Sequence, residues 1–200
     1  HWHDIELRDR DESICGIWDY LVHVSESEIL ALPIPEPYQL LCEVDAPVEA
    51  QHLMGFWYGF VPAVKRKRSL KRKNYGVAGR ESKSLWGPHI RARIAKHLQY
   101  IRHWKVQQGG YQDIPGNEEA TWFIDPPYIG LPGHYVHKSK NLDYKDLADW
   151  CRSRQGQVIV CEGGNADWLP FTECGRNQTH STPLIKPDRP PNIELSWVQG

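Results

Sequence analysis

The chain has 200 residues, of which 40% are hydrophobic and 24% charged, a composition typical of a globular protein with one core and a small insertion. No apolar run approaches the roughly 20 residues of a membrane-spanning helix and no signal peptide is recognisable, so we expect a cytoplasmic protein without membrane contacts. Five cysteines without a Cys-x-x-Cys pair argue against a disulfide framework and a zinc site, and the net charge of −1 excludes a surface wholly devoted to a polyanion.

The first residues predict a short strand followed by a helix. Ile5–Arg8 is an alternating stretch that ends at Asp9. Ser13–Val24 has apolar residues at helical spacing, and either Asp11 or Ser13 is suited to be its N-cap.

A capping box predicts the next helix. Ser25 and Glu28 have the spacing of such a box, which indicates a helix over Glu26–Leu32. Three prolines end this helix, and Tyr38–Cys42 is expected to form a strand or a short helix. Ala46–Phe60 predicts a further helix that is rich in large apolar residues.

Residues 61–85 have no periodic apolar face and are typical of an insertion. Seven of the nine residues from 65 to 73 are basic, namely Lys65, Arg66, Lys67, Arg68, Lys71, Arg72 and Lys73. We predict a helix over Gly87–Trp104, which adds further basic residues between Arg91 and Lys105. This segregated basic segment indicates a polyanionic partner, although a solvated loop explains the charge equally well.

The last part of the chain alternates strands with a helix. Ala120–Ile124 is a short apolar run of strand type, which Asp125 ends because two prolines follow it. Tyr144–Arg154 predicts a helix, Gln157–Cys161 a buried strand and Ile193–Val198 an alternating last strand. This order of elements predicts an α/β fold with a mainly parallel sheet.

The tetrapeptide Asp125-Pro126-Pro127-Tyr128 has the groups needed to activate an aromatic amine. Such an amine is a weak nucleophile because its lone pair is delocalised into the ring. To activate it, a site must accept hydrogen bonds from both of its N–H groups. Asp125 offers a charged acceptor and the carbonyl of Pro126 a second one. Tyr128 offers a ring on which a planar base can stack. The simpler alternative is a Pro-Pro turn that ends a strand, with a capping Asp and a packed Tyr.

In this motif the chain resembles the amino-group methyltransferases that use S-adenosylmethionine, and from Trp104 to Phe171 it is similar to the Dam-type and phage-type DNA adenine-N6 methyltransferases. The similar residues are Trp122–Tyr128, Tyr135, Asp143-Tyr144, Leu147, Gly156–Val160 and Trp168-Leu169-Pro170-Phe171. The resemblance implies a Rossmann-like methyltransferase fold and transfer of a methyl group to adenine N6 in DNA. An Asp in the first position favours adenine in DNA. Methyltransferases that act on cytosine N4 or on RNA adenine are the alternatives.

The resemblance also implies where the methyl donor binds. Ile5–Asp9 is similar to the family's second strand, whose terminal acidic residue binds the ribose hydroxyls. We expect Asp9 in this role with Asp11 as the reserve, and Asp125 as a further donor-side residue, although an ordinary helix N-cap explains the first two equally well. The first strand and its Gly-rich loop have no counterpart in the chain, so we expect a truncated N terminus, and a non-catalytic DNA-binding remnant is a further alternative. Glu162 departs from the small polar residue common in the family.

These expectations divide the chain into three parts. Residues 1–60 and 113–200 would form the methyltransferase core, and residues 61–112 a basic helical target-recognition insertion. We expect a monomer that binds double-stranded DNA, with the basic segment on phosphates. Tyr135 and Lys138, in a different glycine-containing loop from Ile129 to Lys140, are candidate contacts to a flipped base. Trp86 and Trp104 are expected to pack rather than to contact DNA.

Overall fold

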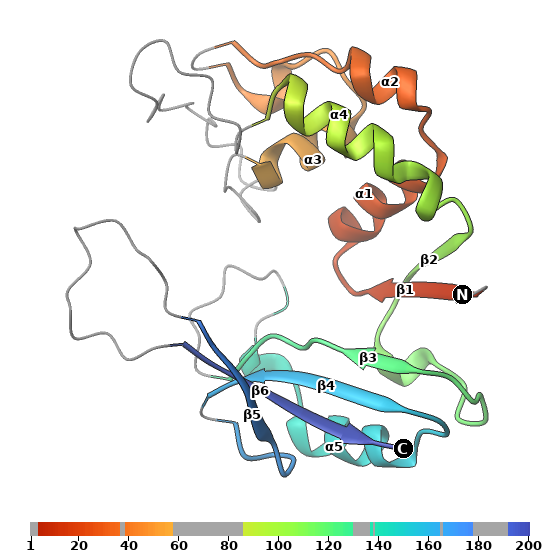
Figure 1. The fold of residues 1–200 in the computed structure, drawn as a ribbon, viewed down its shortest axis with the longest axis vertical. Helices are drawn as coiled ribbons and strands as arrows, with labels where there is room; N and C mark the ends of the chain where they lie inside the picture. The colour runs from red at the N-terminus through yellow and green to blue at the C-terminus, as the bar shows by residue number, and fades with distance from the viewer. Residues whose placement is uncertain are drawn as a thin grey trace, which may run out of the picture. The chain divides into compact units, whose positions relative to one another are not determined.

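The computed structural model describes residues 4–36, 39–57, 86–129, 137, 139–164, 166–177 and 192–200. The predicted basic segment from Lys65 to Lys73 lies outside these residues, and so do Tyr135 and Lys138. The chain divides into two compact units, His1–Gly110 and Tyr111–Gly200, each with its own hydrophobic core (Figure 1).

Four α-helices form the body of the first unit. They are α1 (Glu12–His23), α2 (Glu26–Ala31), α3 (Val48–Trp57) and α4 (Pro88–His97), with the 3-10 turns η1 (Leu41–Glu43) and η3 (Leu98–Tyr100). Their apolar faces meet in one core, in which Ile29, Met54, Ile90 and Leu98 are fully buried. Asp11 caps α1, and Ser25 with Glu28 forms the predicted capping box of α2.

The first unit also contains a pair of parallel strands, of which only the first was predicted from the sequence. β1 (Ile5–Asp9) pairs in parallel with β2 (Trp104–Gln108), so that Ile5 lies opposite Trp104 and Asp9 opposite Gln108. α4 ends at His97 and the 3-10 turn η3 continues it to Tyr100, so the prediction of a helix through Trp104 was wrong beyond Tyr100. Since α4 shares the core of α1, α2 and α3, the described part of the expected insertion belongs to the same unit as the residues before it.

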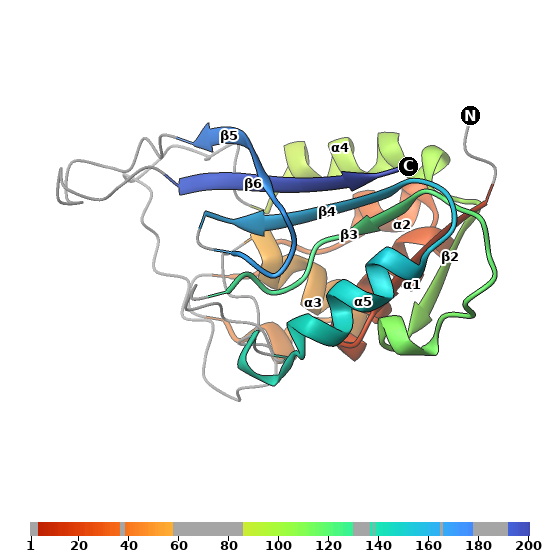
Figure 2. The same cartoon turned by 90° about the horizontal axis from the view of Figure 1, so that it is seen from below.

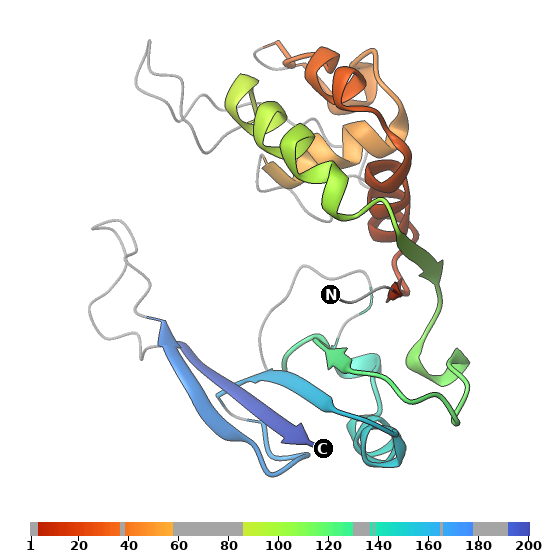
Figure 3. The ribbon, with the colours of Figure 1, turned by 45° about the vertical axis from the view of Figure 1, so that its right-hand side comes forward.

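In its described residues, the second unit has a four-stranded sheet with one α-helix on it. The strands β3 (Trp122–Ile124), β4 (Val158–Gly163), β5 (Thr172–Asn177) and β6 (Asn192–Gln199) lie in the order β3-β4-β6-β5. The helix α5 (Tyr144–Ser153) packs on one face, with the 3-10 turns η4 (Tyr111–Asp113) and η5 (Ser139–Asn141) before it (Figure 3). Val158, Val160 and Leu147 are buried where the sheet meets the helix.

The mixed α and β structure agrees with the sequence prediction, but the sheet of the second unit is not mainly parallel in its pairing. β3 and β4 pair in parallel, whereas β6 is antiparallel to both β4 and β5. As a result β3, β4 and β5 point one way and β6 points the other (Figure 2). β5 was not predicted, because Thr172–Asn177 has no alternating apolar pattern and contains a register shift between Glu173 and Gly175.

Candidate functional site

The Asp125–Tyr128 tetrapeptide lies where β3 ends, beside the parallel strand β4. Trp122 and Ile124 of β3 pack into the core of the unit, and Phe123 between them is 68% exposed on the other face. The strand ends here because neither proline can donate to a sheet ladder. Asp125 is therefore held at the carboxyl end of a parallel strand pair, the edge at which open α/β sheets bind ligands.

The surroundings of Asp125 raise the pKa of its carboxyl group. Although the residue is exposed overall, packing around its carboxyl group raises its pKa, and the nearby charge of Glu194 on β6 raises it further. A hydrogen bond from the Tyr128 side chain acts in the opposite direction and lowers it. The structure thus places two carboxyl groups and one phenol together at this edge of the sheet.

Tyr128 is the donor in this hydrogen bond. Burial raises the pKa of its hydroxyl strongly, and the charges of Asp125 and Glu194 raise it further, so the phenol stays protonated. Its ring lies against the backbone of Gly163, where an added Cβ atom would be 3.1 Å from Tyr128 Cδ2. A side chain larger than hydrogen at position 163 would therefore push the Tyr128 ring.

The backbone on both sides of Tyr128 is bound by two side chains, the half-buried Tyr144 and the buried Glu162. The Tyr144 hydroxyl, at the start of α5, donates to the carbonyl oxygen of Pro127. The amide of Ile129 donates to Glu162 Oε1 over 3.1 Å. Burial, followed by the charge of Glu162, raises the pKa of Tyr144 to about 12, which keeps it a donor as well.

Sequence reasoning did not assign a role in the site to Glu194, Tyr144 or Trp168. Tyr144 and Trp168 were noted only as parts of the family resemblance, and their rings lie 5.4 Å apart between centroids. Glu194 follows the alternation of β6 and has no sequence signal of a site. Glu162 was visible as a polar residue at the end of an apolar strand, which is the one signal that could have directed attention to it.

The predicted donor-side acids lie in the first unit, at the end of β1. Asp9 Oδ1 accepts from the amide of Asp11 over 2.7 Å, and the Asp9 carbonyl accepts from the Gly109 amide over 2.9 Å. Asp11 Oδ1 accepts from the Ser13 amide and is the N-cap of α1. The structure therefore gives Asp11 a helix-capping role and leaves Asp9 at the carboxyl end of a parallel strand pair. These acids and Asp125 belong to different units.

Two of the arginines grouped with the basic segment have structural roles. Arg91 on α4 donates to the carbonyl oxygens of Leu30 and Leu32 at the end of α2. Arg102 donates to those of Val22 and Val24 at the end of α1. Both guanidinium groups therefore satisfy helix C-termini, where positive charge is favourable. These two arginines stabilise the fold, and the contact of the basic segment with phosphates stays a prediction.

The two tryptophans flanking the predicted helix pack, as expected. Trp86 is 2% exposed, and its indole N–H donates to the Pro33 carbonyl over 3.0 Å. Trp104 lies against Trp18, with ring centroids 5.5 Å apart.

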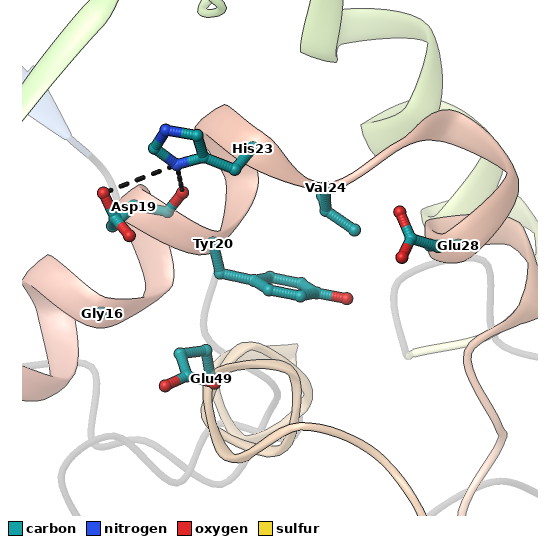
Figure 4. Close-up of a pocket in the computed structure, with 7 residues that line it drawn as sticks. All are labelled: Gly16, Asp19, Tyr20, His23, Val24, Glu28 and Glu49. Carbon is teal, nitrogen blue, oxygen red and sulfur yellow. Dashed lines mark hydrogen bonds and ion pairs between the residues drawn. The ribbon is translucent and has the colours of Figure 1, made fainter.

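A cavity of about 370 Å³ lies among α1, α2 and α3 of the first unit (Figure 4). Tyr20 points into it between Glu28 and Glu49, and His23 pairs with Asp19 on α1 over 3.6 Å. The carboxylates in its lining would repel an anionic ligand such as a nucleic-acid phosphate. The cavity contains none of the predicted site residues.

Within the described ranges, no group of three or more His, Cys, Asp and Glu side chains is arranged to hold a metal ion. None of the helices in those ranges is long and apolar enough to cross a membrane.

Comparisons with known proteins did not assign the chain to a family. No family model matches its sequence, and no curated protein matches it.

Proposed function

We propose that this chain is the catalytic part of a DNA methyltransferase that transfers a methyl group from S-adenosylmethionine to N6 of adenine. The observation that supports the proposal most directly is the position of Asp125-Pro126-Pro127-Tyr128 at the carboxyl end of β3, beside the parallel strand β4. The motif resembles that of the amino-group methyltransferases, and its surroundings suit the chemistry. The finer assignment to a Rossmann-like methyltransferase fold is part of the same proposal.

The chemistry requires two acceptors for one amine. The carboxylate of Asp125 would accept one N–H of the adenine amino group, and the carbonyl of Pro126 the other. Accepting both bonds draws the nitrogen lone pair out of conjugation, so that it can attack the methyl carbon. S-adenosylmethionine, when bound, supplies that electrophilic methyl group. The amine proton is lost after attack, and Asp125 is the nearest base to receive it.

Tyr128 would have two successive roles in this site. Its hydroxyl bonds Asp125 in the present structure, and the incoming amine would replace the hydroxyl at the carboxylate. Its ring would then stack on the base, an interaction worth about 1–3 kcal/mol per base. Adenine must leave the duplex to reach such a site, at a cost of a few kcal/mol.

The residues present fit the methyl donor in one respect. Asp9 has a carboxylate at the carboxyl end of a parallel strand, a group and a position suited to a ribose diol. Asp11 is the weaker candidate because its carboxylate caps α1. The basic segment from Lys65 to Lys73 would contact the phosphates of double-stranded DNA and position the duplex.

A direct test is to incubate the protein with isotopically labelled S-adenosylmethionine and double-stranded DNA and to identify the methylated nucleosides by mass spectrometry. We expect N6-methyladenine from the wild type and none from Asp125→Ala. Asp149→Ala is the matched control, because Asp149 is an exposed aspartate on α5 that pairs with Lys145 and Arg152 on the same helix. N4-methylcytosine as the product, labelling of RNA in place of DNA, label that persists in Asp125→Ala, or no label from the wild type would each contradict the proposal.

A further inference from the structure

Glu162 is a buried acid at a position where the strand pattern calls for an apolar side chain. It shares the inward face of β4 with Val158 and Val160, and all three are 0% exposed. It is also the one buried charged or polar residue among those that the structure describes. Burying a carboxyl group is costly unless hydrogen bonds replace its water, so the partners of Glu162 indicate why it is there.

Among the described residues, the hydrogen bonds to the Glu162 carboxylate come from N–H groups. Oε1 accepts from the amides of Ile129 and Gly163, over 3.1 and 2.8 Å. Oε2 accepts from the indole Nε1 of Trp168 over 3.0 Å. A carboxylate is acceptor-only and matches three N–H donors, whereas a glutamine amide would point its own N–H bonds at one of them.

These partners lie next to Tyr128 or contact residues that bind its neighbours. Ile129 follows Tyr128 directly, Gly163 supports the Tyr128 ring, and Trp168 packs against Tyr144, whose hydroxyl binds the Pro127 carbonyl before Tyr128. We call Glu162, Tyr144 and Trp168 the loop clamp. Through it, the peptide groups on both sides of Tyr128 are tied to the buried side of the sheet.

We propose that Glu162 is a positioning residue, which sets the orientation of the Tyr128 ring and hydroxyl relative to Asp125 through the Ile129 amide and Trp168. The inference rests on the proposed function, since Tyr128 is the stacking surface for the base there. Glu162 itself touches neither base nor methyl donor. It acts by limiting how far residues 125–129, which directly follow β3, can move, and small displacements of a stacking group can cost about 100-fold in rate.

The test compares Glu162→Gln with Glu162→Gln/Trp168→Phe. In the single variant the new amide N–H bonds face an N–H donor, so we expect kcat to fall about 10- to 100-fold with KM for DNA changed less than about threefold. In the double variant the opposing indole N–H is gone and the amide oxygen can accept from both backbone amides. We expect it to regain part of kcat, which no independent loss of two contacts would produce. A double variant no more active than the single one would overturn the proposal.

Hydrogen exchange separates this inference from the proposed function, because it needs no methylation. We expect the Ile129 amide to exchange faster in Glu162→Gln than in the wild type, while amides in the middle of α5 are unchanged. Tyr144→Phe, which removes the hydroxyl that bonds to Pro127 and Ser139, covers the case in which Glu162→Gln does not fold, and should also speed exchange of the Ile129 amide. If the Ile129 amide exchanges faster in a variant whose kcat equals that of the wild type, the positioning role is wrong and the proposed function stands. If the wild type does not methylate, the proposed function fails, and unchanged Ile129 exchange in both variants would overturn the clamp separately.

Discussion

Two parallel strand pairs in this protein each have an acidic residue at a carboxyl end, but the two acids have different surroundings. Asp9 ends β1 of one parallel pair, and Asp125 follows β3 of another. After Asp9 the chain turns directly into α1, and the Asp9 carboxylate accepts from the Asp11 amide in that turn. After Asp125 two prolines prevent any helix, and the Asp125 carboxyl group is left beside Tyr128 and Glu194 with a raised pKa. The residues that follow a strand therefore decide whether its terminal acid is held by the adjoining backbone, as Asp9 is, or lies beside side chains from other elements, as Asp125 does.

Replacement of Asp125 should have the largest effect on activity. Asp125→Asn keeps the shape of the side chain but loses the charged acceptor, so we expect kcat to fall about 100- to 1,000-fold, as for loss of one group that stabilises a transition state. Methylation kinetics with saturating DNA would measure this. Activity within about twofold of the wild type would show that the two strand ends do not differ in the proposed way.

The same variant should change the pH dependence of stability. Because burial raises the pKa of Asp125 above its ordinary 3.8, the folded protein binds the carboxyl proton more tightly than the unfolded chain. The contribution of this group to stability is therefore present below pH 3.8 and is lost as the pH rises through the raised pKa. Denaturation of both proteins from acidic to neutral pH should show the wild type losing stability relative to Asp125→Asn over that window. A relative gain would contradict the assigned shift.

Replacement of Asp9 should have the next largest effect, on donor binding. A hydrogen bond to a charged group contributes about 1.5–3 kcal/mol, so we expect Asp9→Asn to weaken S-adenosylmethionine binding about 10- to 100-fold. Calorimetric titration would measure the affinity. The turn after β1 should remain, because the asparagine oxygen can still accept from the Asp11 amide. Equal affinity in both proteins would remove Asp9 from the donor site.

Asp11→Ala should instead reduce stability. Loss of an N-cap costs about 1 kcal/mol, and we expect the free energy of unfolding to fall by that amount, as measured in urea. Asp11→Ser, which can still cap α1, is the matched control and should recover most of the loss. A loss of donor affinity larger than that of Asp9→Asn would reverse the roles of the two acids.

The smallest effects concern the pH at which activity is lost, and two variants should act in opposite directions. Tyr128→Phe keeps the ring but removes the hydrogen bond that lowers the pKa of Asp125. As the pH is lowered, this variant should therefore lose activity at a higher pH than the wild type. Glu194→Gln removes a negative charge that raises this pKa, so activity should persist to a lower pH. Rate–pH profiles of kcat/KM would measure both. Shifts in the same direction would contradict the arrangement around Asp125.

Much of the local structure could be predicted from the sequence because its causes are local. The caps of α1 and α2 follow from side chains within three residues of the helix start, and β3 and β4 follow from short apolar runs. β2 could not be predicted in this way, because helical spacing continues through Ile101 and its partner β1 lies almost a hundred residues earlier. β5 depends in the same way on pairing with a distant strand, β6.

The candidate site, too, has some features with local causes and others that depend on distant segments of the chain. The sequence by itself determined the tetrapeptide, the end of the strand at Asp125 and the chemical groups on offer, because the prolines and the apolar run act within a few residues. Only the tertiary structure decided which groups surround them. Glu194 comes from β6, Tyr144 from α5 and Glu162 from β4, and they reach the motif because the sheet and its helix bring distant segments together. Charge and hydrogen bonding act over a few ångströms in space, whatever the separation along the chain.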